Sequence, residues 1–103
     1  MDQKAVKKTL IHFKTVLESL GIRVDRLILY GSYAIGTERE DSDIDVVVIS
    51  ENFINRTYWE RIDILTEAIY QVRAPIEVSA FTCEEWVAEQ SLIVDFARNG
   101  ILV

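Results

Sequence analysis

Two carboxylates and a Gly-Ser pair are the residues of this chain whose types and spacing could do chemistry. Asp43 and Asp45 alternate with Ile44 at the start of an apolar run that ends at Ile49. On a β-strand the side chains alternate between the two faces, so both aspartates would point the same way. Two carboxylates held side by side repel each other unless a cation lies between them, and hard oxygen ligands suit Mg²⁺. The spacing therefore predicts a metal-binding pair on a strand over residues 43–49.

The Gly-Ser pair, Gly31 and Ser32, follows an apolar run that predicts another strand at residues 26–30. Glycine lets the chain turn tightly, and a short helix after it would leave free backbone N–H groups that bind anions. Each feature has a plain alternative, because Gly-Ser is a common turn and acidic clusters are usually solvated loops. Their combination favours a site, since carboxylates in a buried strand are costly without a counter-charge. A phosphate site and a metal site in one segment indicate a nucleoside triphosphate bound with Mg²⁺.

This segment closely resembles the nucleotidyltransferase superfamily that includes DNA polymerase beta, and in particular its minimal nucleotidyltransferase branch. The resemblance rests on the pattern G-S-x10-D-x-D, which Gly31, Ser32, Asp43 and Asp45 match with the spacer intact. It implies transfer of a nucleoside monophosphate from a triphosphate to a hydroxyl, with release of pyrophosphate. Gly31 and Ser32 would hold the β- and γ-phosphates, and the two aspartates would hold Mg²⁺, with two ions expected.

The chain departs from this family at two positions. Many relatives have an arginine where this chain has Ile35, which leaves Arg39 as the nearest cation for binding the triphosphate. The superfamily also needs a third carboxylate on a neighbouring strand, usually an aspartate in the minimal branch. Residues 76–81 predict that strand, and Glu77 is its only acid. We expect Glu77 to bind the metal or to act as the base for the incoming hydroxyl. The alternative is an exposed glutamate on a solvent-facing strand face.

The resemblance also suggests a partner. Members of this branch commonly act beside a small helical HEPN-domain protein, as antitoxin and toxin, and adenylylate a tyrosine of it. ATP is then the expected donor. Two other classes stay open: a small-molecule nucleotidyltransferase that resembles the catalytic half of aminoglycoside-modifying enzymes, and a non-catalytic module that neutralises its partner by contact.

Composition limits these functions further. The chain has 103 residues, which indicates a single domain over residues 1–103, and a partner or a second copy is expected to complete the site. Seventeen acidic and 11 basic residues give a net charge of −6, which argues against binding to a long nucleic acid. No run is long enough for a membrane span and no signal-peptide pattern opens the chain. With Cys83 as the only cysteine, these features predict a cytoplasmic protein.

The surrounding pattern predicts the elements that position these residues. Residues 3–20 have apolar side chains at helical spacing, and Gly21 supplies a stop. Residues 57–60 and 82–85 are capping boxes that begin two further helices, of which the first ends before Pro75 and the second runs to about Gln90. The first of these helices is expected to bury a stripe formed by Trp59, Ile62, Leu65 and Ile69.

The last part of the chain has helical spacing at residues 91–98, which Asn99 and Gly100 end. The apolar residues 101–103 are expected to dock into a core or a partner. The order of helices and strands predicts an α/β fold of the nucleotidyltransferase kind, with a small mixed sheet that has the acids on one face and helices packed on the other.

Overall fold

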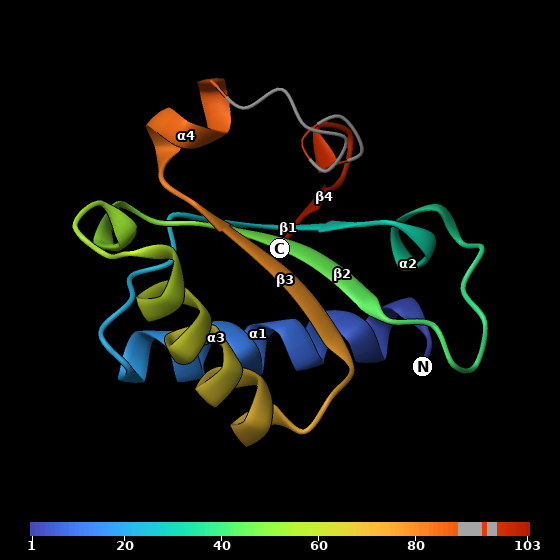
Figure 1. The fold of residues 1–103 in the computed structure, drawn as a ribbon. Coiled ribbons are helices and arrows are strands. Elements are labelled where there is room, and N and C mark those ends of the chain that lie inside the picture. Colours follow the sequence, from blue (N-terminus) through green and yellow to red (C-terminus); the bar gives the residue numbers. More distant parts are fainter. Residues whose placement is uncertain (89–93, 95–96) are drawn as a thin grey trace.

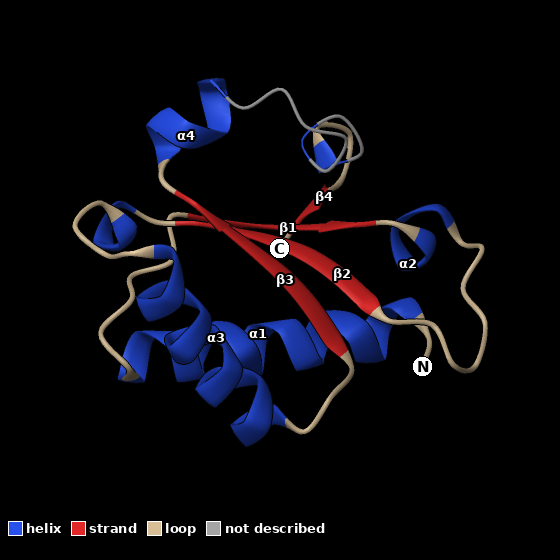
Figure 2. Ribbon diagram, viewed as in Figure 1, coloured by secondary structure: helices blue, strands red, loops and turns tan. Residues whose placement is uncertain are grey.

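A computed structural model of the chain describes residues 1–88, 94 and 97–103 (Figure 1). A four-stranded mixed sheet forms the centre, with helices on either side of it (Figure 2). The elements in chain order are α1 (Gln3–Ser19), β1 (Arg26–Tyr30), α2 (Ser32–Ile35), β2 (Ile44–Ile49), the 3-10 turn η1 (Glu51–Phe53), α3 (Tyr58–Val72), β3 (Ile76–Phe81), α4 (Cys83–Ala88) and β4 (Ile101–Leu102).

The strand order in the sheet is β3-β2-β1-β4. β1 pairs antiparallel with both β2 and β4, while β2 and β3 run parallel. A parallel pair needs a crossover connection, and α3 supplies it between β2 and β3. The predicted α/β fold with a small mixed sheet is therefore confirmed.

The helix boundaries follow from local chemistry. The side chain of Asp2 accepts a hydrogen bond from the backbone N–H of Ala5 at 2.8 Å, which caps α1. Gly21 adopts φ +91° after the helix, and Ile22 then folds back so that its N–H donates to the Leu17 carbonyl at 3.0 Å. Both expectations from the sequence, the helix and its stop, are confirmed.

The main core lies between the sheet and the helices α1 and α3. Val6, Leu10 and Phe13 of α1 are fully buried against strand residues such as Leu29 and Val46. A second, smaller apolar cluster covers part of the opposite face and consists of Ile28, Val47, Ile49, Trp86, Val94 and Ala97. The rest of that opposite face, beside the first residues of β2, carries polar side chains.

One expected stripe is partly wrong. Trp59 is 72% exposed, and the buried residues of α3 are Leu65 and Ala68. Trp59 lies about two and a half turns before Ala68, which places it on the opposite side of the helix. Its ring packs edge-on against Tyr58, with the ring centroids 5.1 Å apart.

Two other expectations concern chain boundaries. β2 begins at Ile44, so Asp43 precedes the strand and is exposed. The predicted helix over residues 91–98 falls mostly outside the described residues, as does the end of the second capped helix at Gln90. The apolar end of the chain docks into the core as predicted: β4 pairs with β1, and the Val103 N–H donates to the Leu27 carbonyl at 2.8 Å. Within the described residues, no helix is long and apolar enough to cross a membrane.

Candidate active site

Three polar side chains form a row across three neighbouring strands. The parallel register of β2 and β3 pairs Asp45 with Glu77, and the antiparallel register of β1 and β2 pairs Tyr30 with Asp45. Paired residues on neighbouring strands project from the same face of a sheet. Tyr30, Asp45 and Glu77 therefore lie side by side, on the face opposite α1 and α3. We call these three residues the site row.

Asp45 is the carboxylate of the site row whose pKa is raised by its surroundings. Burial, the charge of Glu77, a hydrogen bond shared with Glu77 and the charge of Asp43 together raise the pKa of Asp45 to about 6. Half-burial raises the pKa of the Tyr30 hydroxyl too, and the charges of Asp45 and Glu77 add to the effect. The row is thus a place where negative charge accumulates without a compensating cation among the described residues. Such a place favours the binding of one.

Gly31 lets the Asp45 carboxylate lie directly against the backbone of the Gly-Ser turn. It has φ +74° and ψ −154°, a backbone conformation that is essentially restricted to glycine. A Cβ built on Gly31 would collide with Asp45 Oδ2 and would lie 3.1 Å from Asp45 Cγ. The missing side chain therefore keeps the backbone of the Gly-Ser turn in contact with the Asp45 carboxylate. This is the close approach that a phosphate held between the turn and a carboxylate-bound cation would require.

The other predicted residues are placed less tightly. Ser32 begins α2 and is half-buried, and its hydroxyl makes no hydrogen bond to the described part of the chain. Arg39 lies exposed in the loop between α2 and β2, where its backbone N–H donates to Ser42 Oγ at 2.8 Å. Its guanidinium forms no ion pair with any described residue, and Ile35 is 74% exposed on α2. The structure thus brings Gly31, Asp45 and Glu77 together and leaves Arg39 unattached.

Asp43 contributes negative charge to the site but does not belong to the site row. Its side chain is exposed, and its negative charge is felt at Asp45. In the described residues no group of three acidic, histidine or cysteine side chains is arranged to hold a metal ion. The chemistry of the donors still fits Mg²⁺, because this ion is commonly bound by one or two carboxylates together with substrate phosphates and water.

Tyr30 is the member of the site row that the sequence did not single out. It was read only as the last residue of the first strand. The signal lies in the pairing: Tyr30, directly before the Gly-Ser turn, pairs across the antiparallel strands with Asp45, the second residue of β2. That pairing depends on the register, which the sequence alone does not state.

Comparison with known proteins agrees with this geometry. The profile of the nucleotidyltransferase domain family matches residues 10–103. The chain belongs to the nucleotidyltransferase domain family. A search of curated proteins found no match.

A crystal structure supports the same fold. It is that of an inferred nucleotidyltransferase from Sulfolobus solfataricus, which superposes on 97% of this chain and 80% of its own with a TM-score of 0.70. The two sequences are 18% identical, so the likeness concerns the fold. Family membership supports nucleotidyl transfer as the general chemistry of this domain. The site row and the Gly31 turn are the parts of this member that suit it.

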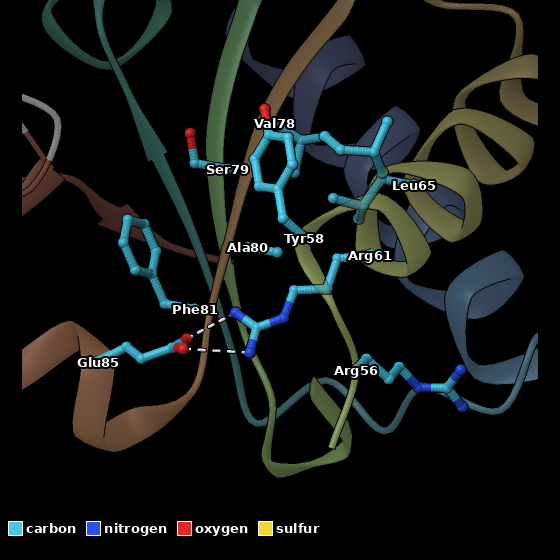
Figure 3. A pocket seen from close by; sticks show the side chains of 10 residues that line it. Arg56, Tyr58, Arg61, Leu65, Val78, Ser79, Ala80, Phe81 and Glu85 are labelled. Carbon is cyan, nitrogen blue, oxygen red and sulfur yellow. Dashed lines mark hydrogen bonds and ion pairs between the residues drawn. The ribbon is translucent and has the colours of Figure 1, made fainter. Parts of the chain in front are cut away.

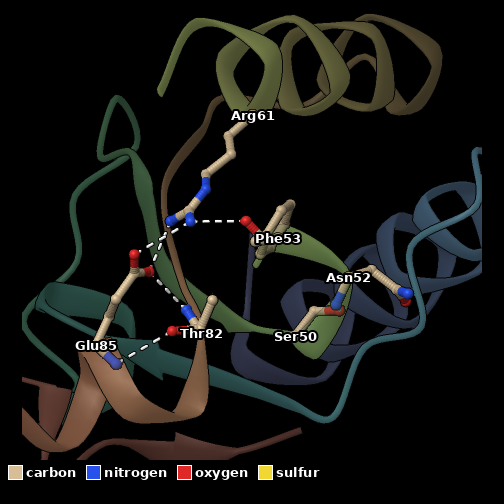
Figure 4. A network of polar contacts seen from close by, with 6 residues as sticks. All are labelled: Ser50, Asn52, Phe53, Arg61, Thr82 and Glu85. Carbon is tan, nitrogen blue, oxygen red and sulfur yellow. Dashed lines mark hydrogen bonds and ion pairs between the residues drawn. The ribbon is translucent and has the colours of Figure 1, made fainter. Parts of the chain in front are cut away.

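A cavity lies beside β3, and none of the site-row residues lines it. It has a volume of about 650 Å³ and is bordered by α3, β3 and the start of α4 (Figure 3). One end is closed by a bidentate ion pair, in which the Arg61 guanidinium contacts the Glu85 carboxylate at 2.6 and 3.1 Å. Arg61 also donates to the Phe53 carbonyl at 2.7 Å, while Glu85 accepts from the Thr82 N–H at 2.8 Å (Figure 4). This network ties η1, α3 and α4 together at the edge of the sheet.

Proposed function

We propose that the chain is a Mg²⁺-dependent nucleotidyltransferase that moves AMP from ATP to a tyrosine hydroxyl of a HEPN-domain toxin. In this proposal it acts as the antitoxin of the pair. The family match supports nucleotidyl transfer, and the resemblance of the G-S-x10-D-x-D segment to the minimal branch supports the donor and the partner. The observation that carries the proposal is the β2–β3 register, which sets Glu77 beside Asp45, the carboxylate that lies against the Gly31 turn.

Each site residue has a role in this proposal. The turn at Gly31 and Ser32 holds the β- and γ-phosphates, because its backbone approaches without a side chain in the way. Asp45 and Glu77 hold Mg²⁺ from one side, with Asp43 joining once the charge is neutralised, and two ions are expected. Arg39, on the exposed loop between α2 and β2, is the cation assigned to the triphosphate.

The mutual repulsion of the acids is the reason for assigning them to a metal. The bound metal would polarise the α-phosphate and stabilise the charge that develops on the departing pyrophosphate. Glu77 lies at the outer end of the site row, on the edge strand, where an incoming acceptor can reach it. It is therefore placed to take the proton from the acceptor hydroxyl while the hydroxyl oxygen forms its bond to the α-phosphorus.

Substitutions at Glu77 test this assignment. The partner is incubated with ATP and Mg²⁺, and mass spectrometry reads the mass added to its tyrosine. Glu77→Gln should lose most transfer and keep much of its affinity for ATP, because Asp45 remains. Glu77→Asp keeps the charge and restores the residue more usual in the resembling branch, so it should retain appreciable activity.

The matched control is Glu84→Gln, an exposed glutamate in the first turn of α4. It should leave transfer unchanged. Transfer by Glu77→Gln at the rate of the unaltered protein would show that Glu77 is only a surface residue. Modification of a small hydroxyl compound in place of the partner would instead assign the chain to the small-molecule class, and absence of any transfer would favour neutralisation by contact.

A further inference from the structure

One edge of the sheet offers unpaired backbone groups. β3 is an edge strand, and among the described residues no other strand pairs with its outer side. The Ile44 N–H donates to the Pro75 carbonyl at 2.8 Å, and the Ser50 N–H donates to the Phe81 carbonyl at 3.0 Å. Alternate residues of a parallel strand face its partner, so the odd-numbered residues of β3 bond to β2. The N–H and C=O groups of the even-numbered residues, Val78 and Ala80 among them, therefore point outward.

The cavity bordered by α3, β3 and the start of α4 runs along this same edge. Val78 and Ala80 line it from β3, and Ile62 and Leu65 line it from α3. Tyr58 is 66% exposed and also lines the cavity (Figure 3). The cavity thus combines outward-facing backbone donors and acceptors with apolar walls. An extended peptide satisfies both, because it can pair with the strand while alternate side chains enter the groove.

We propose that this groove binds an extended segment of a partner protein as an added strand beside β3, and that this segment carries the acceptor hydroxyl. The docking part stands on the edge strand and the groove alone. The acceptor part rests on the proposed function, because it needs a hydroxyl that is nucleotidylated at the site row.

The register of the sheet connects the two parts. A residue of the added strand that pairs with Glu77 projects from the same face as Glu77. It would become the fourth member of the row, next to Glu77 and with a Cβ–Cβ separation of roughly 4.5–5.5 Å. Its neighbours opposite Val78 and Ala80 project from the other face, toward Ile62 and Leu65. Recognition and reaction would then use alternate residues of one segment.

Charge favours a partner segment over a second copy of this chain. Each copy has a net charge of −6, and pairing two β3 strands would bring two rows of carboxylates into one continuous sheet. A basic segment has the complementary charge, and a neutral segment avoids the repulsion between carboxylates. We therefore infer a segment with a hydroxyl residue, apolar residues at the first and third positions from it, and no acidic residues nearby.

A synthetic peptide with this pattern tests the proposal on the full chain. The peptide has one tyrosine, valines at the first and third positions from it, and lysines at its ends, and binding is followed by fluorescence anisotropy. Two methylated forms carry N-methyl groups on alternate residues. In either direction of pairing only one alternate set of N–H groups bonds to β3, so only one of the two forms should lose binding. Equal binding of both forms would overturn the proposal.

A pair of variants locates the binding site. Ile62→Lys places a charge in the groove and should weaken peptide binding by about tenfold or more. Ile11→Lys makes the same change on α1, at a side chain that is 58% exposed and does not line the groove, and should bind as the unaltered chain does. Equal affinity of the two variants would contradict docking in the groove.

The remaining outcomes separate this inference from the proposed function. With ATP and Mg²⁺, the bound peptide should gain the mass of one AMP on its tyrosine. If the unaltered chain binds ATP with Mg²⁺ but does not bind the peptide, the inference is overturned and the proposed function still stands. Peptide binding with the alternate methylation pattern, but no ATP binding, would support docking and contradict the function. A dimer that Val78→Pro dissociates in sedimentation would assign the edge to a second copy and overturn the proposal.

Discussion

Asp45 is the residue whose environment has the clearest energetic consequence. Its pKa in the fold, about 6, lies above its ordinary value of 3.8. Between these values the folded chain binds more protons than the unfolded chain, so the free energy of unfolding decreases as pH rises through this range. The contribution of Asp45 to stability is therefore present at low pH and lost near neutrality in the absence of metal. Glu77, Asp43 and Tyr30 are the titratable groups that face it.

Asp45→Asn should consequently be more stable than the unaltered chain at pH 7 and should differ from it least near pH 4. Urea denaturation at a series of pH values, with EDTA present, measures this difference. The control is Asp41→Asn, an exposed loop residue, which should show no such pH-dependent gap. A constant difference between Asp45→Asn and the unaltered chain across this range would contradict the electrostatic account.

Gly31 makes a second residue-scale prediction, with Gly36 as its matched comparison. Both have positive φ, but only at Gly31 would a Cβ meet another atom, namely the Asp45 carboxylate. Gly36→Ala should cost about 1 kcal/mol of stability from backbone strain alone. Gly31→Ala should cost more and should also reduce ATP binding in calorimetry. Equal effects of the two substitutions on ATP affinity would show that the phosphate site lies elsewhere.

At the same scale, the sequence predicted some residues better than others. Gly31 and Asp45 could be named because a Gly-Ser turn and a carboxylate in an apolar strand occur together in one segment, and Glu77 because it is the only acid of the strand that the resemblance requires. Tyr30 could not, because its role depends on the strand it faces. Trp59 was misplaced because a helix with apolar residues on several sides does not reveal which side meets the sheet.

Among the elements, α4 depends most on a single side chain. Glu85 accepts the Thr82 N–H and receives both guanidinium nitrogens of Arg61, which links the start of α4 to α3. These hydrogen bonds from Arg61 and Thr82 outweigh partial burial and lower the pKa of Glu85. Glu85→Ala should lower the free energy of unfolding by about 1–2 kcal/mol, the typical effect of losing a cap. Thermal unfolding measures it.

The control for Glu85 is Glu84→Ala, which removes a neighbouring carboxylate from the same first turn. It should cost only a few tenths of a kcal/mol, since a first-turn charge interacts with the helix dipole alone. If both substitutions had the same effect, the capping box and the ion pair would contribute nothing beyond that dipole.

Element boundaries were predicted closely, and their pairing was not. Capping boxes, the Gly21 stop and Pro75 are local signals, and each marks a boundary that the structure confirms. The parallel pairing of β2 with β3 joins segments on either side of α3, and no local signal encodes such a contact. The site row exists only through that pairing: the resemblance gave the expectation that Glu77 lies on a strand next to Asp45, and Tyr30 came from the fold.

For the molecule as a whole, one face of the sheet packs the main core and the other carries the candidate active site. α1 and α3 bury one face in the main core, while the opposite face carries the site row at one end and the smaller apolar cluster beyond it. The sequence predicted the acids on one face and the helices on the other, but not that α4 and the smaller apolar cluster cover part of the face with the acids. It did not predict the order of the strands, in which the end of the chain returns to lie beside β1.

Gly100 controls how that end reaches β1, and it gives the prediction for the whole molecule. The sequence assigns Asn99 and Gly100 to a helix stop, but a Cβ at Gly100 would lie 2.5 Å from the Leu29 carbonyl oxygen and 2.6 Å from Ile28 Cγ2. Gly100 is therefore needed for close packing against β1. Gly100→Ala should destabilise the fold by roughly 1–3 kcal/mol, as overpacking does.

Urea denaturation compares Gly100→Ala with Asn99→Ala, whose side chain is exposed. A stop that depended on local turn propensity would make the two substitutions similar, whereas close packing makes only Gly100→Ala costly. Hydrogen exchange adds a second reading, because the displaced strand should weaken protection at the Val103 N–H, which donates to Leu27. Unchanged protection there, together with unchanged stability, would mean that the end of the chain reaches β1 without requiring a glycine.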